Sequence, residues 1–197
     1  MPRGRKRAFF ASAGLEYHYC PREVSISSLA KVRIMTHNDI LRRLRFMFSQ
    51  NDTDVIAVFA AAEHEITKDQ IRHWLAKEDD AYYESMSGED LASFLDGLIN
   101  QKRGKRSGPQ PLPETHLNNN IIATKLKIAL NLKGEEIIEI LKRADFRLSA
   151  SELSAFFRKP GNRQYRPMQD QVLRYFLRGL QIKFRPMADK DSESSPS

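Results

Sequence analysis

The chain has 197 residues and a mass of 22.7 kDa, with 41% hydrophobic residues, 29% charged residues and a net charge of +7. This composition is typical of a globular protein and excludes collagen-like, disulfide-rich and wholly disordered chains. No apolar run is long enough to cross a membrane, and the single cysteine, Cys20, excludes an internal disulfide and a zinc site made of two to four thiolates. A reducing cytoplasm is therefore expected.

Residues 1–34 carry +5 of the net charge, with seven Lys or Arg and two Glu. A nucleic-acid-binding arm would use such arginines and aromatic residues. A secretory signal would need a longer apolar centre than Ala8 to Leu15. We favour a third interpretation, in which translation begins at Met35, because every interpretable pattern starts there. An intact mass would test it.

Two parts of the chain repeat each other. An offset of 82 residues aligns residues 38–103 with 120–185 without a gap and with 14 identical pairs. The identities concentrate at apolar positions, and the pattern Phe-Leu-x-Gly-Leu of residues 94–98 returns at 176–180. We infer a tandem duplication.

Each copy is predicted to form four short helices. In the first copy, apolar residues at helical spacing mark one helix around Ile40 and Leu44, with Asn38 as its N-cap, and a second around Val55 and Phe59. The second copy repeats these patterns from Asn120 onward. No alternation typical of a β-strand is present over a useful length.

Capping boxes mark the start of the third helix in each copy. They pair Thr67 with Gln70 and Ser149 with Glu152, so that each side chain satisfies a backbone N–H that the helix start leaves free. The third and fourth helices then follow with one apolar face each.

A glycine lies inside the fourth predicted helix of each copy, at Gly97 and Gly179. Glycine inside a helix costs about 1 kcal/mol relative to alanine, so some other feature must offset this cost. We favour a close approach between two helices. A ligand that approaches the backbone is the alternative.

These patterns divide the chain into five segments. Residues 1–34 are a doubtful or disordered extension, 35–103 an acidic first repeat, 104–119 a Pro-rich linker, 120–185 a basic second repeat, and 186–197 a disordered tail. The prolines of the linker favour an extended connector.

Four segments carry a resemblance to a known family. They are NDILRRLR at 38–45, LASFLDGL at 91–98, GPQP at 108–111 and FRKPG at 157–161. Together they resemble the YehS-like bacterial family, which is built from two copies of a domain of unknown function. The resemblance covers residues 35 to about 185. It implies a small cytoplasmic all-α protein that starts close to Met35, and it implies no reaction.

No catalytic constellation is present in the sequence. His64 and His73 have no histidine counterpart in the second copy, and the HExxH, P-loop, GxSxG and paired-cysteine patterns are absent. The acidic run 78–80 could hold a hard cation, and the segment 63–65 could pair a carboxylate with an imidazole. Solvated surface is the simpler interpretation of both. We therefore expect a protein that is not an enzyme and has no catalytic residue, cofactor or metal.

The second and third predicted helices of each copy resemble the apolar framework of a repressor-type helix-turn-helix. The resemblance is partial, because Glu65 and Arg147 stand where that motif usually has glycine and the turn is longer. The exposed positions of the third helix of the second copy are poorly suited to contacting phosphate, and they are Ala150, Ser151, Glu152 and Ser154. A packing core that does not bind DNA is the interpretation we favour.

Charge separates the two copies. Residues 35–103 contain eight Lys or Arg and thirteen Asp or Glu, whereas residues 120–185 contain fourteen and six. The basic residues flank the turn at Pro160–Gly161 and are predicted to form a stripe on the last helix. The candidate site for an anion, a phosphate or an acidic partner comprises Arg158, Lys159, Arg163, Tyr165, Arg166, Arg174, Arg178 and Arg185.

An acidic protein, the acidic first repeat or a nucleic-acid backbone could neutralise this site, and Tyr165 could stack on a base. The sequence predicts an all-α protein of two tandem four-helix repeats, partly helix-turn-helix-like, that acts by binding through its basic second repeat. We favour an acidic protein partner or the first repeat, with nucleic acid as the alternative. A membrane partner is not expected, and the oligomeric state stays open.

Overall fold

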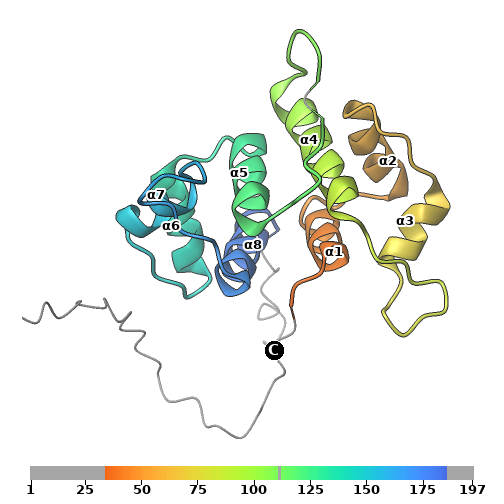
Figure 1. Ribbon diagram of the computed structural model, residues 1–197. Helices are drawn as coiled ribbons and strands as arrows, with labels where there is room; N and C mark the ends of the chain where they lie inside the picture. The colour runs from red at the N-terminus through yellow and green to blue at the C-terminus, as the bar shows by residue number, and fades with distance from the viewer. Residues whose placement is uncertain (1–33, 111, 186–197) are drawn as a thin grey trace, which may run out of the picture. The chain divides into compact units, whose positions relative to one another are not determined.

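A computed structural model describes residues 34–110 and 112–185 (Figure 1). The predicted tail, and the predicted extension apart from Ile34, lie outside the described residues. The described part is all-α and has no strand, which confirms the predicted fold class of two tandem repeats. None of its helices is both long enough and apolar enough to cross a membrane. Its eight helices are α1 (His37–Met47), α2 (Asp52–Ala61), α3 (Lys68–Leu75), α4 (Gly88–Arg103), α5 (Asn119–Ala129), α6 (Gly134–Arg143), α7 (Ala150–Phe156) and α8 (Asp170–Phe184).

Both predicted capping boxes are confirmed. Thr67 caps α3 and Ser149 caps α7, and in each case the side chain three residues later bonds back to the N-cap backbone. These bonds satisfy N–H groups that the first turn of a helix leaves free, so the third helix of each repeat starts where the sequence places it.

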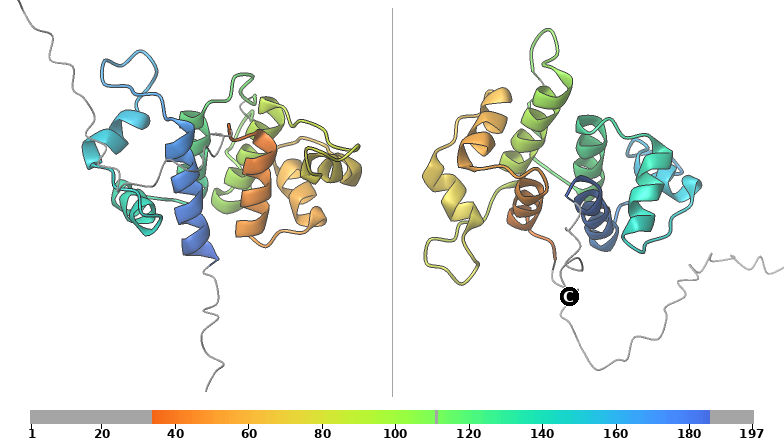
Figure 2. Two further views of the ribbon diagram at one scale, coloured as in Figure 1. Left: turned by 90° about the horizontal axis from the view of Figure 1, so that it is seen from below. Right: turned by 180° about the vertical axis from the view of Figure 1, so that it is seen from behind.

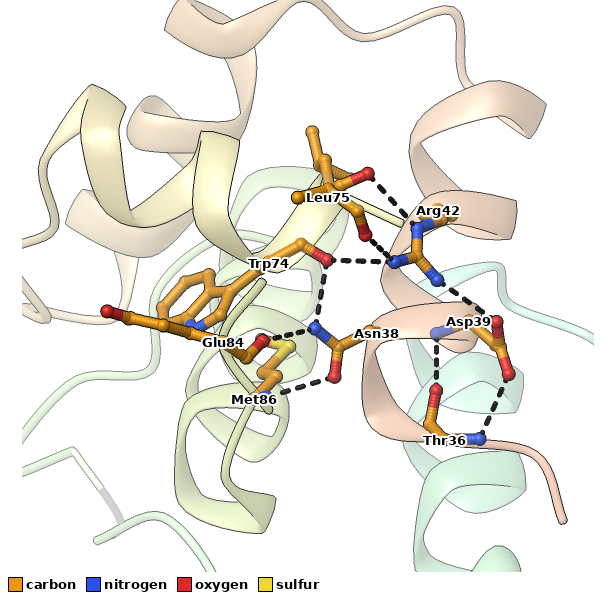
Figure 3. A network of polar contacts seen from close by, with 9 residues as sticks. Thr36, Asn38, Asp39, Arg42, Trp74, Leu75, Glu84 and Met86 are labelled. Carbon is orange, nitrogen blue, oxygen red and sulfur yellow. Dashed lines mark hydrogen bonds and ion pairs between the residues drawn. The ribbon is translucent and has the colours of Figure 1, made fainter. Parts of the chain in front are cut away.

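Asn38 does not cap α1, and the prediction that it would was wrong. The N-cap is Thr36, and Asn38 is the second helical residue, fully buried (Figure 3). The Asn38 amide donates to the carbonyl oxygens of Trp74 at 2.9 Å and Glu84 at 2.8 Å, and its oxygen accepts from the backbone N–H of Met86 at 2.9 Å. The side chain therefore ties the segment after α3 to the first helix.

Asn120 repeats this arrangement in the second repeat. Its amide donates to the carbonyl oxygens of Phe156 at 2.8 Å and Arg166 at 2.9 Å, and its oxygen accepts from the N–H of Met168 at 2.8 Å. Each partner lies 82 residues after its counterpart. Because buried polar groups require hydrogen-bond partners, this amide fixes the same loop in both repeats.

The two helical glycines mark close contacts between helices, as the favoured interpretation predicted. A Cβ atom added to Gly97 of α4 would lie 1.8 Å from the carbonyl oxygen of Val58 in α2. A Cβ atom added to Gly179 of α8 would lie 2.1 Å from the carbonyl oxygen of Ile140 in α6. Backbone of the second helix therefore occupies the space that a ligand would have needed.

The turn between the second and third helices differs from that of a DNA-binding helix-turn-helix. Residues 62–67 connect α2 to α3, which is longer than the three or four residues of that motif. The backbone adopts a left-handed conformation at Glu63 and at Asp145, each with φ of 60°, and not at positions 65 and 147. The likeness is therefore limited to the apolar framework.

The two repeats contact each other through two helix pairs. The contact of α4 with α5 is extensive, and α1 also lies against α8 (Figure 2). Buried side chains from all eight helices, α1 to α8, belong to one apolar core.

Candidate anion-binding site

The basic loop, which we define as residues 158–166, connects α7 to the segment before α8. The backbone N–H of Asn162 donates to the Lys159 carbonyl oxygen at 3.1 Å, and that of Tyr165 donates to the Asn162 carbonyl oxygen at 2.9 Å. The N–H of Arg166 donates to the Ala155 carbonyl oxygen at 3.2 Å. Together with the Asn120 amide, these bonds give the loop a defined shape.

The basic loop has four cations and no carboxylate. Arg158, Lys159, Arg163 and Arg166 are all exposed. Within residues 34–110 and 112–185, none of these four side chains makes a hydrogen bond or an ion pair. Their charges therefore have no neutralising partner in this part of the chain.

The cations of the last helix do not form the continuous stripe that the sequence predicts. Arg178 is exposed, and Arg174 is half-buried with an Nη2 atom that lacks a hydrogen-bond partner in the described chain. Arg185 lies beyond the helix end at Phe184, with φ of −140°. Its Nη1 donates to the Phe46 carbonyl oxygen at 2.7 Å, and its guanidinium lies 4.0 Å from the centre of the Phe46 ring. Because the helix ends before it, Arg185 turns to the first repeat.

A cleft of about 450 Å³ lies where the basic loop, α4, α5 and the linker meet, and we call it the inter-repeat cleft. The structure brings three predicted site residues to it, Arg158, Lys159 and Tyr165, and adds Arg106 of the linker. Arg163, Arg166 and the α8 arginines do not line it. Its apolar lining residues are Ala62, Ile99, Ile121, Ile128, Phe156, Phe157 and Pro160.

A buried ion pair that the sequence analysis missed also lines the cleft. Lys125 of α5 is only 7% exposed and contacts Asp96 of α4 and, at 2.8 Å, Glu114 of the linker. Burial raises the pKa of Asp96 above its ordinary value, and repulsion from Glu114 adds to this, whereas the hydrogen bond and the charge of Lys125 oppose it. The sequence signal that could have revealed this pair is the position of Lys125, a charged residue beside Leu126 on the apolar face of the first helix of the second repeat.

Most other polar side chains of the cleft are already bonded within the chain. Asn100 donates to the Ala61 carbonyl oxygen at 2.9 Å and to Gln110 at 3.2 Å. Thr124 donates to the Asn120 carbonyl oxygen at 2.7 Å. The groups that are open to a ligand are therefore the exposed cations and the Tyr165 ring.

The other sites considered from the sequence do not assemble. His64 pairs with Asp90 of α4, with 3.4 Å between Nε2 and Oδ1, and not with its neighbouring glutamates, while Glu63 contacts Lys105. In the described residues, no group of three or more His, Cys, Asp or Glu could hold a metal ion, and this includes the acidic run 78–80.

The start of α7 is also unsuited to phosphate. Hydrogen bonds from Ser149 lower the pKa of Glu152, which therefore keeps a negative charge in the first turn. A carboxylate at that position would repel a nucleic-acid backbone. The candidate site is thus the basic loop and not the helix before it.

Comparisons with known proteins agree with the duplication. A family model described as "Protein of unknown function (DUF1456)" matches residues 37–104 and again residues 119–185. The chain is similar to "Uncharacterized protein YehS" of Escherichia coli (strain K12), with 44% identity over 147 residues that cover 74% of this chain and 94% of that protein. No solved structure matches the chain.

Proposed function

The chain belongs to the DUF1456 family of proteins of unknown function, and we propose that it is a non-enzymatic cytoplasmic binding protein whose basic loop holds a single strand of nucleic acid. The observation that carries this proposal is the set of four exposed cations on one nine-residue loop, none of them paired in the described chain. Such cations gain affinity for a phosphate backbone because they release its condensed counterions.

The contacts between the repeats favour a partner outside the chain. The charged side chains of the second repeat that contact the first repeat are Lys125, which meets Asp96, and Arg185, which meets the backbone of Phe46. Asp170 also does so, since its carboxylate accepts from the backbone N–H of Met35 at 3.3 Å. The basic loop takes no part in these contacts, so its charges remain available to another molecule.

The aromatic side chains beside the loop support nucleic acid as the partner. Tyr165 and Phe157 line the same cleft as Arg158 and Lys159. Bases stack on aromatic rings while neighbouring cations follow the phosphates, and each stacked base contributes about 1–3 kcal/mol. Aromatic rings are also enriched at protein–protein interfaces, so it is their position beside cations without a carboxylate partner that supports nucleic acid.

The experiment is a titration of the full chain with a 12-nucleotide single-stranded RNA, its DNA equivalent and a DNA duplex across a salt series. If the four loop cations each contact one phosphate of a single strand, log affinity should fall with log salt with a slope of about −3. The loop variant Arg158→Glu, Lys159→Glu, Arg163→Glu, Arg166→Glu should lose this binding.

A matched control reverses four exposed cations elsewhere, Arg43, Lys68, Lys142 and Arg147, and changes the net charge by the same amount. Both variants keep residues 1–34, so the charges there do not distinguish them. Equal losses in the two variants would show that binding follows net charge and would contradict the assignment to the loop. No binding by the unsubstituted protein at low salt would reject nucleic acid as the partner.

A further inference from the structure

The inter-repeat cleft has the dimensions and lining of a small-molecule site. Its volume of about 450 Å³ lies within the range of about 300–1,000 Å³ that is usual for ligand pockets. Such pockets combine apolar walls with a few polar groups that orient the ligand. The cleft has this composition, because both isoleucine and phenylalanine side chains and exposed cations line it.

The polar groups of the cleft restrict the chemistry of its ligand. Asn100 and Thr124 already donate to backbone carbonyl oxygens, and Lys125 is held between two carboxylates. The exposed cations Arg158 and Lys159 remain open. The matching ligand is therefore a flat apolar body that carries an anionic group at one end.

We propose that the cleft takes one nucleotide unit of the bound strand, with the base against Tyr165 and its phosphate at Arg158, Lys159 and Arg106. This inference rests on the proposed function and specifies where the strand is held most tightly. The phosphate lies at the exposed cations because the Asp96 and Glu114 carboxylates, although paired with Lys125, also line the cleft and would repel it.

Two residues of the second repeat that line the cleft have counterparts in the first repeat with other surroundings. Ile128 of α5 lines it, and the equivalent residue in the first repeat is Phe46, which the Arg185 guanidinium covers at 4.0 Å. Tyr165 lines it, whereas its counterpart Tyr83 belongs to the loop at residues 76–84 of the first repeat, which is acidic. Tyr83 is therefore a matched control for Tyr165, half-buried like it and placed at the same position of the turn.

The test compares Tyr165→Ala with Tyr83→Ala in the RNA titration. Tyr165→Ala should weaken binding of the 12-nucleotide RNA at least about fivefold, because one stacked base is lost. The salt slope should stay unchanged, since no phosphate contact is removed. Tyr83→Ala should bind as the unsubstituted protein does. Tyr165→Phe, which keeps the ring, should retain most of the affinity.

A second measurement does not depend on the folding of any variant. The same RNA with 4-thiouridine at single positions is photo-crosslinked to the unsubstituted protein, and the linked peptides are identified by mass spectrometry. Crosslinks should map to residues 156–165 and to the linker near Arg106.

The outcomes separate this inference from the proposed function. If the loop variant loses binding while Tyr165→Ala binds normally and crosslinks lie outside the cleft, the nucleotide site is overturned and the loop assignment stands. If the unsubstituted protein binds none of the nucleic acids, the proposed function fails and this inference fails with it.

Discussion

The loop at residues 76–84 of the first repeat and the basic loop of the second have the same backbone hydrogen bonds and opposite charge. In the first loop, the N–H of Asp80 donates to the Lys77 carbonyl oxygen at 2.9 Å, and that of Tyr83 donates to the Asp80 carbonyl oxygen at 3.1 Å, as do their counterparts 82 residues later. The first loop has one cation and four carboxylates, and the second has four cations and no carboxylate. The loop shape therefore does not depend on its charges.

The two loops share a hydrogen bond to a buried side chain in the interior of their repeat. A buried amide, Asn38 or Asn120, bonds each loop to the first helix of its repeat. Because the interior groups fix the backbone, the exposed side chains could diverge without changing the fold. The comparison thus separates residues that build the frame from those that give each repeat its surface.

The two helix pairs between the repeats show a similar contrast. Lys125 and Asp96 form a buried ion pair between α5 and α4. The equivalent positions between α1 and α8 are Arg43 and Arg178, which are both exposed cations and cannot form such a pair. The contact with the ion pair is also the more extensive of the two.

The largest expected effect is on the free energy of unfolding and concerns the two helical glycines that both repeats share. Gly97→Ala and Gly179→Ala should each lower the free energy of unfolding by about 3 kcal/mol, because the new Cβ atom would overlap a backbone carbonyl that cannot move aside cheaply. Urea denaturation of each variant measures the loss. Gly134→Ala is the control, since its Cβ would have one neighbour, at 4.0 Å, and stability should stay the same or rise by up to about 1 kcal/mol. A similar loss at all three positions would refute the assignment of close contacts.

A smaller effect should distinguish the two contacts between the repeats. Lys125→Met should lower the free energy of unfolding by about 2 kcal/mol, less than for a fully buried pair because Asp96 and Glu114 keep some access to water. Arg43→Met, at the equivalent position of α1, should change it by less than about 0.5 kcal/mol. Chemical denaturation of both variants under one set of conditions provides the comparison. Equal effects would mean that the ion pair does not distinguish the two contacts.

The smallest effect is a pH dependence of the same ion pair. Burial raises the pKa of Asp96 above 3.8, so the folded state binds its proton more tightly than the unfolded state does. The stability of the unsubstituted protein relative to Asp96→Asn should therefore fall as pH rises from about 3.8 through the folded pKa, and then level off. Denaturation of both proteins between pH 3 and pH 7 measures this difference. A difference that grows with pH would show that attraction to Lys125 outweighs burial.

Local patterns were sufficient for much of the fold. The duplication and the capping boxes at Thr67 and Ser149 could be found from spacing alone, because helix starts depend on residues within one turn. The glycines also gave a correct prediction, since a glycine inside a helix has a cost that close packing explains. The role of Asn38 was missed because its partners lie 36 to 48 residues away.

The sequence by itself determined the class of fold, the two repeats and the concentration of positive charge in the second, because these follow from periodicity and composition. Only the tertiary structure decided which charges are neutralised. It buries Lys125 against Asp96, turns Arg185 to the first repeat and leaves Arg158 and Lys159 unpaired beside Tyr165 on a cleft. A charge has a partner only if folding brings one within a few ångströms, and residue order along the chain does not specify that distance.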